Sequence, residues 1–368
     1  MSDSPPPTRP PAEITHLVRE RIEARARRDW PRADALKAQI EAAGWRVVDH
    51  GNRTSVSPAA PPIVEVGGEK RYGSAAQVPS LLDGPATTTW TIAVVASEEP
   101  ARVSRLLAGL RAHAPAGTGV VVVANDPSDS QAAALLPEAA DRASICAEVL
   151  RTSTRLGCAA ALNIALRRAT GEFVLLADGT AWPTGDALTP LAAALHDPAV
   201  AAAGGFGLYA ASAGPLRPNA LSREPATDQA TAGATAAATA LEGAWLAFRR
   251  SDYRELGPLD ERFATPAWLD LWWTLRLRAG AEPEGAEYAE PAATDEPEAP
   301  DSSGGGEPAV VAVDARAAEV EMPAPRRAVR LALPLDRDEV AWPPDRSRLN
   351  RRNMYRVLDR FGWRDDLS

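Results

Sequence analysis

The chain has 368 residues, 45% of them hydrophobic, and a formal net charge of −9 at neutral pH. This length is enough for one large domain with appendages and a sizeable core. Its only cysteines are Cys146 and Cys158 and its histidines are scattered singly, which excludes a disulfide framework and a zinc site of the usual ligand spacing.

The sequence holds no apolar run long enough to cross a membrane, and Met1 to Pro7 lack the order of a signal peptide. We therefore expect a cytoplasmic protein. Peripheral contact with a membrane stays open.

Residues 1–12 are rich in proline, and we expect them to be disordered. Apolar residues at helical spacing then predict two helices between Glu13 and Ala43, separated at Asp29-Trp30-Pro31 and stopped by Gly44. The resulting unit, a helical hairpin over residues 13–56, is below the size at which a domain usually folds without support.

This hairpin resembles the C-terminal segment of cysteinyl-tRNA synthetases. The matching residues are Arg21, Arg25, Arg28, Asp29, Trp30, Ala33, Asp34, Leu36, Gly44, Trp45, Val47, Asp49 and Gly51. That segment lies near the anticodon-binding end of the synthetases, so the resemblance implies at most a module close to tRNA. We favour the alternative, an amphipathic hairpin whose arginines form a solvated face.

Residues 57–89 are rich in Pro, Gly and Ser and have little periodicity, so we expect a linker there. From Trp90 onward, strands alternate with helices, which predicts an α/β domain with a largely parallel sheet covered by helices. The expected strands are Thr91–Ala96, Gly119–Asn125, Ala147–Arg151, Gly171–Ala177 and Val200–Leu208, and the expected helices are Ala101–Ala112, Gln131–Asp141, Cys158–Ala169 and Leu188–His196.

The strand after Gly171 ends abruptly on Asp178 and a Gly179-Thr180 turn. Ligands of α/β sheets gather at the carboxyl ends of strands, so Asp178 marks a predicted site for a charged ligand. The alternative for Asp178 is a turn acid at a strand end.

The later part of the domain is interrupted twice. Residues 226–240 are rich in Thr, Ala and Gly and are expected to be mobile, and structure resumes over Leu241–Arg250. Ala281–Pro325 is expected to be a disordered acidic insertion within the domain of residues 90–368. The acids between 281 and 307 account for the net charge, so the rest of the chain is near neutral.

Ordered blocks from Trp90 onward resemble the family 2 glycosyltransferases. The residues that carry the resemblance are Gly157, Asn163, Thr170, Gly171, Glu172, Asp178, Gly257, Asp260, Glu261, Phe263 and Asp270. The resemblance implies a GT-A-like nucleotide-diphospho-sugar transferase fold, Rossmann-like, with a mostly parallel sheet and helices on both faces. Thr180 stands where the family carries the second acid of Asp-x-Asp.

The resemblance also implies a binding site for a nucleotide-diphosphate sugar. Its expected donor-binding residues are Ser97, Asn125, Asp129, Asn163, Asp178 and Thr180. Ala124 replaces an acid that the family carries after the second strand, and Asp338 and Val340 stand at two positions that are often His in one branch. Asp178 is the expected metal ligand for Mn²⁺ or Mg²⁺, and one carboxylate predicts weak affinity for the free ion.

Asp270 stands where the family has its general base, at the start of a helix, so it is the expected catalytic residue. Its alternative is a helix-start acid stabilised by the helix dipole. Trp268, Trp272 and Trp273 follow the same block, and we expect at least one of them to stack on an acceptor sugar. Clusters of this kind are more often part of a core.

We therefore expect an inverting glycosyltransferase that acts on a saccharide or cell-envelope acceptor. The departures at Ala124, Thr180, Asp338 and Val340 leave open a catalytically degraded, transferase-like scaffold or interaction protein. Association with tRNA is the weakest reading, because no broad basic surface or interleaved aromatics accompany the hairpin.

Overall fold

The computed structural model describes residues 10–50, 53–58, 61–96, 100–125, 145–210, 221–223, 235–266, 268–280, 324–339, 344, 347–362 and 364–367. Several expectations lie outside these residues: the disorder of residues 1–9, the helix Gln131–Asp141, the roles of Ser97 and Asp129, Val340, and nearly all of the insertion Ala281–Pro325.

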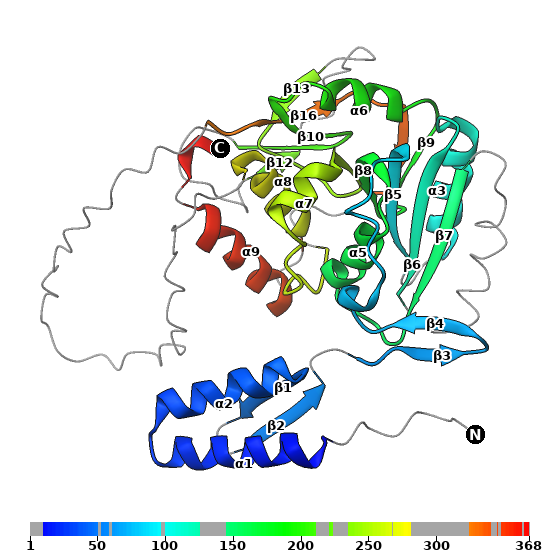
Figure 1. Cartoon of the computed structure of the whole chain (residues 1–368). Helices are drawn as coiled ribbons and strands as arrows, with labels where there is room; N and C mark the ends of the chain where they lie inside the picture. The colour runs from blue at the N-terminus through cyan, green and yellow to red at the C-terminus, as the bar shows by residue number, and fades with distance from the viewer. Residues whose placement is uncertain are drawn as a thin grey trace, which may run out of the picture.

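The N-terminal unit contains the two predicted helices and, in addition, a β-hairpin (Figure 1). Its elements are α1 (Ala12–Ala26), α2 (Trp30–Ala42), β1 (Trp45–His50) and β2 (Arg53–Pro58). Asp29 caps α2 by accepting a hydrogen bond from the N–H of Arg32, and Gly44 turns the chain with a positive φ of 79°. Ile14, Ile40 and Trp45 belong to a small core of the unit itself.

A buried ion pair holds the helices of this unit to its β-hairpin. Both guanidinium nitrogens of Arg21 donate to the carboxylate of Asp49, at 3.1 and 2.8 Å, and Thr54 donates to the same carboxylate. Arg25 adds a second ion pair with Asp49. These bonds lower the pKa of Asp49 to about 2. Arg21 and Asp49, both part of the synthetase resemblance, therefore stabilise the unit's own fold.

A ten-stranded sheet forms the centre of the main domain, in the order β13-β16-β10-β15-β8-β5-β6-β7-β4-β3. The strands β4, β7, β6, β5 and β8 run parallel, and β15 pairs antiparallel with both β8 and β10. The strand bounds are β3 Val64–Val66, β4 Glu69–Tyr72, β5 Thr88–Ala96, β6 Thr118–Ala124, β7 Ile145–Thr152, β8 Gly171–Ala177, β10 Val200–Gly204, β13 Thr235–Ala238, β15 Trp245–Arg249 and β16 Arg327–Leu331.

Helices cover both faces of this sheet (Figure 1). On one face pack α5 (Cys158–Arg167), α7 (Arg250–Leu256), α8 (Leu269–Ala279) and the end of α9 (Arg348–Phe361). On the other face pack α3 (Pro100–His113) and α6 (Leu188–Leu195). Strands buried on both sides read as continuous apolar runs, which is why Val120 to Val123 and Phe173 to Ala177 carry so few polar residues.

Smaller elements complete the domain. They are the 3-10 turns η1 (Ala75–Gln77) and η3 (Asp365–Leu367) and the short strands β9 (Ala181–Pro183), β11 (Gly207–Tyr209), β12 (Ser222–Arg223), β14 (Ala240–Leu241) and β17 (Leu335–Arg337). Within the described residues no helix is both long and apolar enough to span a bilayer.

The linker expected over residues 57–89 is, from residue 61 onward, part of the folded domain. Arg71 pairs with Arg151, which adds β4 to the sheet, and Val78 is only 1% exposed. The N–H of Leu81 donates to the carbonyl of Arg167 at 2.7 Å. These partners are distant in the sequence, so a local composition of Pro, Gly and Ser could not reveal them. Likewise, β13 and β14 occupy part of the stretch that was expected to be mobile.

Candidate active site

Asp178 follows the last residue of β8 and begins a tight turn. Its Oδ1 accepts hydrogen bonds from the backbone N–H of Thr180 at 2.8 Å and from the Thr180 hydroxyl at 2.6 Å. Gly179 has a φ of 80°, and a side chain there would also meet the backbone of Arg102. Asp178 is exposed while Thr180 is buried, so Thr180 orients the carboxylate of Asp178.

Asp270 lies in the first turn of α8, with each carboxylate oxygen held by a backbone N–H. Gly243 donates to Oδ2 and Leu271 donates to Oδ1, both at 2.8 Å. Trp268, just before the helix, has a φ of 69°, which is an uncommon conformation for so large a side chain. The backbone on both sides therefore fixes the position of the Asp270 carboxylate.

The sheet brings Asp178 and Asp270 to the same edge. Trp245 of β15 pairs with Ala177 of β8, so Gly243, which binds Asp270, lies close to Asp178. The charges of both acids act on Cys158, at the start of α5, whose thiol pKa is raised to about 12 by burial and then by these two carboxylates. The candidate site thus lies at the carboxyl end of β8, and its role in ligand binding stays a prediction.

Burial raises the pKa of Asp270 to about 7. The hydrogen bonds from Gly243 and Leu271 act against this rise, whereas the charges of Glu242 and Asp178 add to it. A carboxylate that is half ionised near neutral pH is matched to taking up a proton during a reaction.

A charge cluster next to Gly243 was not predicted from the sequence. Glu242 is buried, and Arg223 donates to both of its carboxylate oxygens, at 2.8 and 2.6 Å. Arg337 of β17 donates to Glu242 at 3.3 Å. The three residues come from separate segments, so only the buried acid in Leu241-Glu242-Gly243 could have hinted at the cluster. They hold the backbone that binds Asp270.

Asn125 and Asn163 use their amides to join chain segments. Asn125 donates to the carbonyl of Leu156 and accepts from its N–H, both at 2.9 Å. Asn163 donates to the carbonyl of Leu259 at 2.9 Å and accepts from the N–H of the same residue. Both side chains are buried. Their role in donor binding stays a prediction, and these bonds favour a positioning role.

The three tryptophans expected at the acceptor side are buried in the core. Trp268, Trp272 and Trp273 are 3%, 5% and 0% exposed. Trp273 packs edge-on against Phe248 and Tyr253. This burial favours the core alternative, and stacking on an acceptor sugar stays a prediction.

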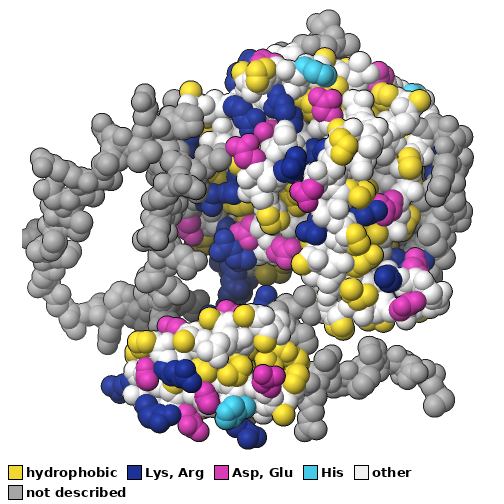
Figure 2. All heavy atoms as spheres, viewed as in Figure 1, with side chains coloured by type: hydrophobic (Ala, Val, Ile, Leu, Met, Phe, Trp, Pro, Cys, Tyr) yellow, Lys and Arg dark blue, Asp and Glu magenta, His cyan; other side chains and the backbone are white. Residues whose placement is uncertain are grey.

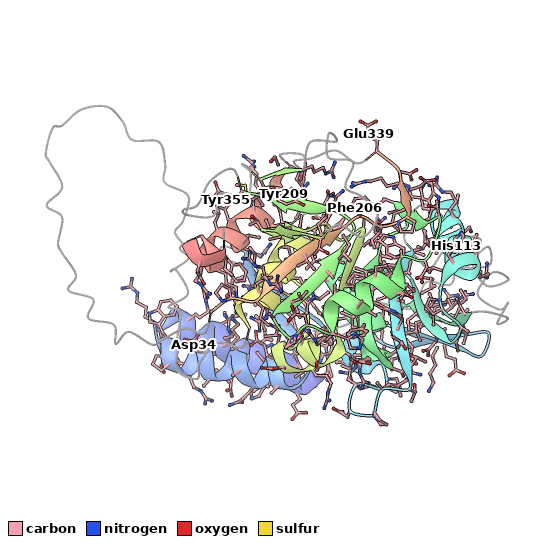
Figure 3. All side chains as sticks on the ribbon, turned by 90° about the horizontal axis from the view of Figure 1, so that it is seen from above. Asp34, His113, Phe206, Tyr209, Glu339 and Tyr355 are labelled. Carbon is pink, nitrogen blue, oxygen red and sulfur yellow. The ribbon has the colours of Figure 1, made fainter. Side chains whose placement is uncertain are left out.

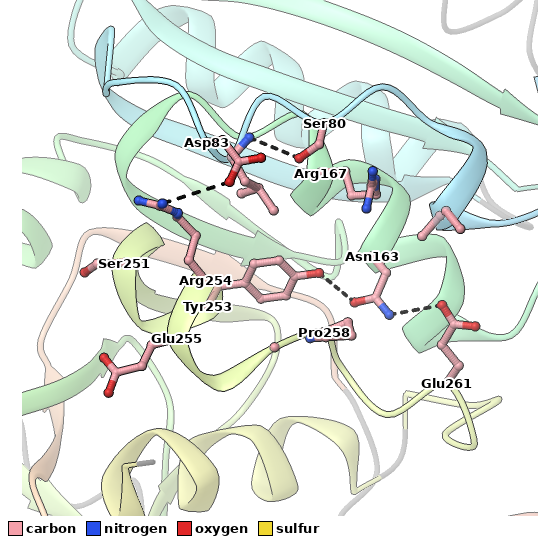
Figure 4. Close-up of a pocket in the computed structure, with 14 residues that line it drawn as sticks. Ser80, Asp83, Asn163, Arg167, Ser251, Tyr253, Arg254, Glu255, Pro258 and Glu261 are labelled. Atoms are coloured by element: carbon pink, nitrogen blue, oxygen red, sulfur yellow. Dashed lines mark hydrogen bonds and ion pairs between the residues drawn. The ribbon is translucent and has the colours of Figure 1, made fainter.

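A pocket of about 750 Å³ lies between α5, α7 and the chain around Ser80 (Figure 4). Tyr253 donates to Asn163 at 3.0 Å, and Asn163 donates to Glu261 at 3.2 Å. Arg254 and Asp83 approach to 4.0 Å at its rim. Neither Asp178 nor Asp270 lines this pocket, whereas Asn163, one of the expected donor-binding residues, does.

The residues near Asp178 do not form a complete site for a free divalent cation. In the part of the chain that the structure describes, no group of three or more His, Cys, Asp or Glu residues could hold a metal ion. Asp338, whose N–H donates to the Thr180 carbonyl, is ion-paired with Arg102 and Arg105. Thr180 engages only Oδ1 of Asp178. The other oxygen fits an ion whose remaining positions are filled by diphosphate oxygens.

A family model and several solved structures are similar to parts of this chain. Residues 91–257 match the family model of glycosyl transferase family 2. No curated protein sequence matches the chain. Among solved structures, GalNAc-T7 with UDP, GalNAc and Mn²⁺ is 13% identical, with a TM-score of 0.50, and the match covers 74% of this chain and 48% of that chain.

Two further structures are similar over smaller parts. The mannosyltransferase PcManGT from Pyrobaculum calidifontis, solved with GDP-Man and Mn²⁺, is 22% identical, with a TM-score of 0.39 and 56% of each chain covered. TarS from S. aureus is 17% identical, with a TM-score of 0.38, and 52% of this chain and 33% of that chain are covered. This chain thus spans about half the length of the first two structures.

The predicted fold is confirmed by the sheet, by the helices on both of its faces and by the similarity to the structure of GalNAc-T7. The synthetase-like hairpin lies outside residues 91–257, and its resemblance stays a prediction. The chain therefore has a GT-A-like α/β fold, and residues 91–257 within it match glycosyl transferase family 2.

Proposed function

We propose that this chain is an inverting glycosyltransferase that moves a sugar from a nucleotide-diphosphate donor to a hydroxyl of a saccharide or cell-envelope acceptor. The observation that carries the proposal is Asp270, held by two backbone N–H groups at the sheet edge next to Asp178, with a pKa of about 7. The match of residues 91–257 to the family supports the same reaction class.

In the proposed reaction, Asp270 accepts the proton of the acceptor hydroxyl. The hydroxyl oxygen forms a bond to the anomeric carbon while the bond to the diphosphate breaks on the opposite face of the sugar. One attack from the opposite face inverts the anomeric configuration. The backbone bonds from Gly243 and Leu271 keep the carboxylate aligned throughout, which is the main contribution of a positioned base.

In this proposal the diphosphate leaves beside Asp178, whose carboxylate is kept oriented by Thr180. A divalent ion, Mn²⁺ or Mg²⁺, would offset negative charge on the leaving diphosphate when bound. In this proposal the donor brings the ion, and Asp178 is its protein ligand. Ser97 and Asp129 belong to the same proposed donor site, and Asn125 and Asn163 support it by fixing the surrounding loops.

A non-catalytic, transferase-like scaffold is the second candidate. Thr180 and Ala124 favour it, because each stands where the family carries an acid and both are buried. A scaffold would retain the fold without the ability to turn over a donor.

Release of nucleoside diphosphate from a panel of uridine, guanosine and thymidine diphosphate sugars tests the proposal, because transferases commonly hydrolyse their donors slowly without an acceptor. We expect release from one nucleotide class, lost on Asp270→Asn while donor binding remains. Donor binding without any release, in wild type as in Asp270→Asn, would support the scaffold instead.

A further inference from the structure

The helix α9 is the most basic element that the structure describes. Over Arg348–Phe361 it carries one acid, Asp359, and five arginines, Arg348, Arg351, Arg352, Arg356 and Arg360. The chain outside residues 281–307 is near neutral, so positive charge is concentrated on this helix against that balance. Figure 2 shows Lys and Arg side chains gathered where α9 lies in Figure 1.

The inner face of α9 is fixed to the domain. Asn353, Val357 and Phe361 are buried. Thr265 donates to Asn350 and accepts from Asn353, each at 3.0 Å, which ties the helix to the segment that leads into α8. Because these residues hold the inner face of α9 against the domain, the side chains on the opposite face of the helix point away from the domain.

On its outer face, α9 carries cations that have no partner among the residues that the structure describes. Arg348, Arg351 and Arg352 are exposed, and their side chains form no hydrogen bond or ion pair within the described residues. Arg352 and Arg262 both lower the pKa of Arg356, after the larger effect of its burial. Arginines that repel one another on an exposed face are expected to favour an anionic partner.

Two large apolar side chains lie among these arginines. Tyr355 is 57% exposed and Leu349 is 50% exposed, and Tyr355 is the most exposed large hydrophobic residue that the structure describes (Figure 3). Basic side chains on an exposed helix face attract anionic lipid headgroups, and an amphipathic aromatic ring beside them places its polar tip at the level of the headgroups.

We propose that the outer face of α9, made of Arg348, Leu349, Arg351, Arg352 and Tyr355, docks on the surface of an anionic lipid bilayer. The arginines are attracted to the negatively charged lipid phosphates, and the side chains of Tyr355 and Leu349 enter the interface between membrane and water. A soluble polyanion such as RNA would match the arginines but would leave Leu349 in water, so the bilayer is the better fit.

The position of α9 links this surface to the candidate active site. Thr265, which bonds to α9, lies between Ala264, whose carbonyl accepts from Cys158, and α8, which carries Asp270. A bilayer bound at α9 would therefore lie beside the segment that positions the base. The docking itself does not depend on the proposed transferase activity.

Vesicle flotation of the full chain tests the docking directly. The probes are phosphatidylcholine vesicles with and without phosphatidylglycerol, at low and high salt. We expect binding only to the anionic vesicles and weakening by salt. The variant Arg348→Gln/Arg351→Gln/Arg352→Gln should bind roughly a hundredfold more weakly, since each basic residue near such a surface contributes about a factor of five.

A matched control separates the site from net charge. Arg27→Gln/Arg32→Gln/Arg254→Gln removes three exposed arginines elsewhere and should bind as the wild type does. Tyr355→Ser should reduce binding that persists at high salt. Circular dichroism establishes that each variant is folded. Absence of binding to anionic vesicles, equal loss in the control, or binding of the face to an RNA oligomer but not to vesicles would each overturn the proposal.

Discussion

The backbone N–H of Gly243 donates a 2.8 Å hydrogen bond to Oδ2 of Asp270 and thereby joins the turn before β15 to the start of α8. A Cβ added at Gly243 would lie 3.1 Å from the Cβ of Asp270, closer than ordinary contact. The absence of a side chain at residue 243 is therefore part of how the carboxylate is placed.

Gly243→Ala should push Asp270 out of position and lower turnover. A shift of a few tenths of an ångström in the base is expected to reduce kcat by about tenfold or more, with little change in donor affinity. The readout is release of nucleoside diphosphate together with donor titration. Gly84→Ala is the control, because a Cβ there meets only a carbonyl at 3.5 Å. Equal effects of the two substitutions would contradict the placement.

Activity should depend on ionised Asp270. Because its pKa is about 7, kcat/KM should rise with pH up to about 7 and then level off. Asp270→Asn should lower the rate by roughly 100-fold or more and abolish this rise, which is the acid limb of the pH–rate profile. A pH–rate profile checks both, and an unchanged acid limb in the variant would assign it to another group.

The stability of the fold should also depend on the ionisation of Asp270, but with the opposite sign: stability should fall over the pH range in which activity rises. The folded-state pKa of Asp270 lies above its unfolded value, so the folded chain binds an extra proton between about pH 4 and 7. The stability that this proton provides is complete below about pH 4 and is lost as pH rises through 7. Relative to Asp270→Asn, the wild type should therefore lose melting temperature over this range. Parallel melting curves of the two proteins would contradict the raised pKa.

Glu242 should raise the pKa of Asp270, the proposed base. Its charge raises the pKa of Asp270, and it pairs with Arg223 and Arg337. Glu242→Gln removes that charge and leaves both arginines, so the acid limb of the pH–rate profile should move to lower pH. Glu255→Gln, a change of an acid within α7 and outside this cluster, should leave the acid limb in place. Loss of rate without any movement of the limb would indicate that Glu242 acts on structure alone.

The N-terminal unit should depend on the pair of Arg21 and Asp49. Asp49→Asn leaves a buried guanidinium short of its partner and should destabilise the unit by about 1–3 kcal/mol. Hydrogen exchange of residues 12–58 in the full chain measures this change, with the exposed Asp34→Asn as control. The pKa of Asp49 is about 2, so its stabilisation exists above about pH 4 and is lost as pH falls toward 2. Equal exchange in both variants would contradict the role of the pair.

The order of strands and helices in the main domain was predictable because local patterns encode it. The apolar run before Asp178 and the helix after Gly157 both lie where their spacing indicated. The strand β4, which lies between β7 and the edge strand β3, was not predictable, because the evidence for it is a pairing of Arg71 with Arg151, far away in the sequence. A strand of polar residues has no apolar pattern of its own, and its pairing partner lies far away in the sequence, so the local sequence does not predict it.

The candidate site was likewise predictable from the sequence only in part. Asp178 and Asp270 could be chosen as candidates because Asp178 directly follows β8 and Asp270 lies in the first turn of α8, each at a recognisable motif. The amides of Asn125 and Asn163, by contrast, bond to Leu156 and Leu259, and a sequence shows the residue type but not its partner. The Glu242 cluster was missed for the same reason, since its arginines come from β12 and β17.

The most direct test of the account is calorimetric titration of the folded chain with uridine, guanosine and thymidine diphosphate sugars, each with and without Mn²⁺. The account predicts saturable binding of one nucleotide class, tighter with Mn²⁺ and with that metal effect lost on Asp178→Asn. Failure of the folded wild type to bind any of these donors would contradict the proposal that this sheet edge is a nucleotide-sugar site.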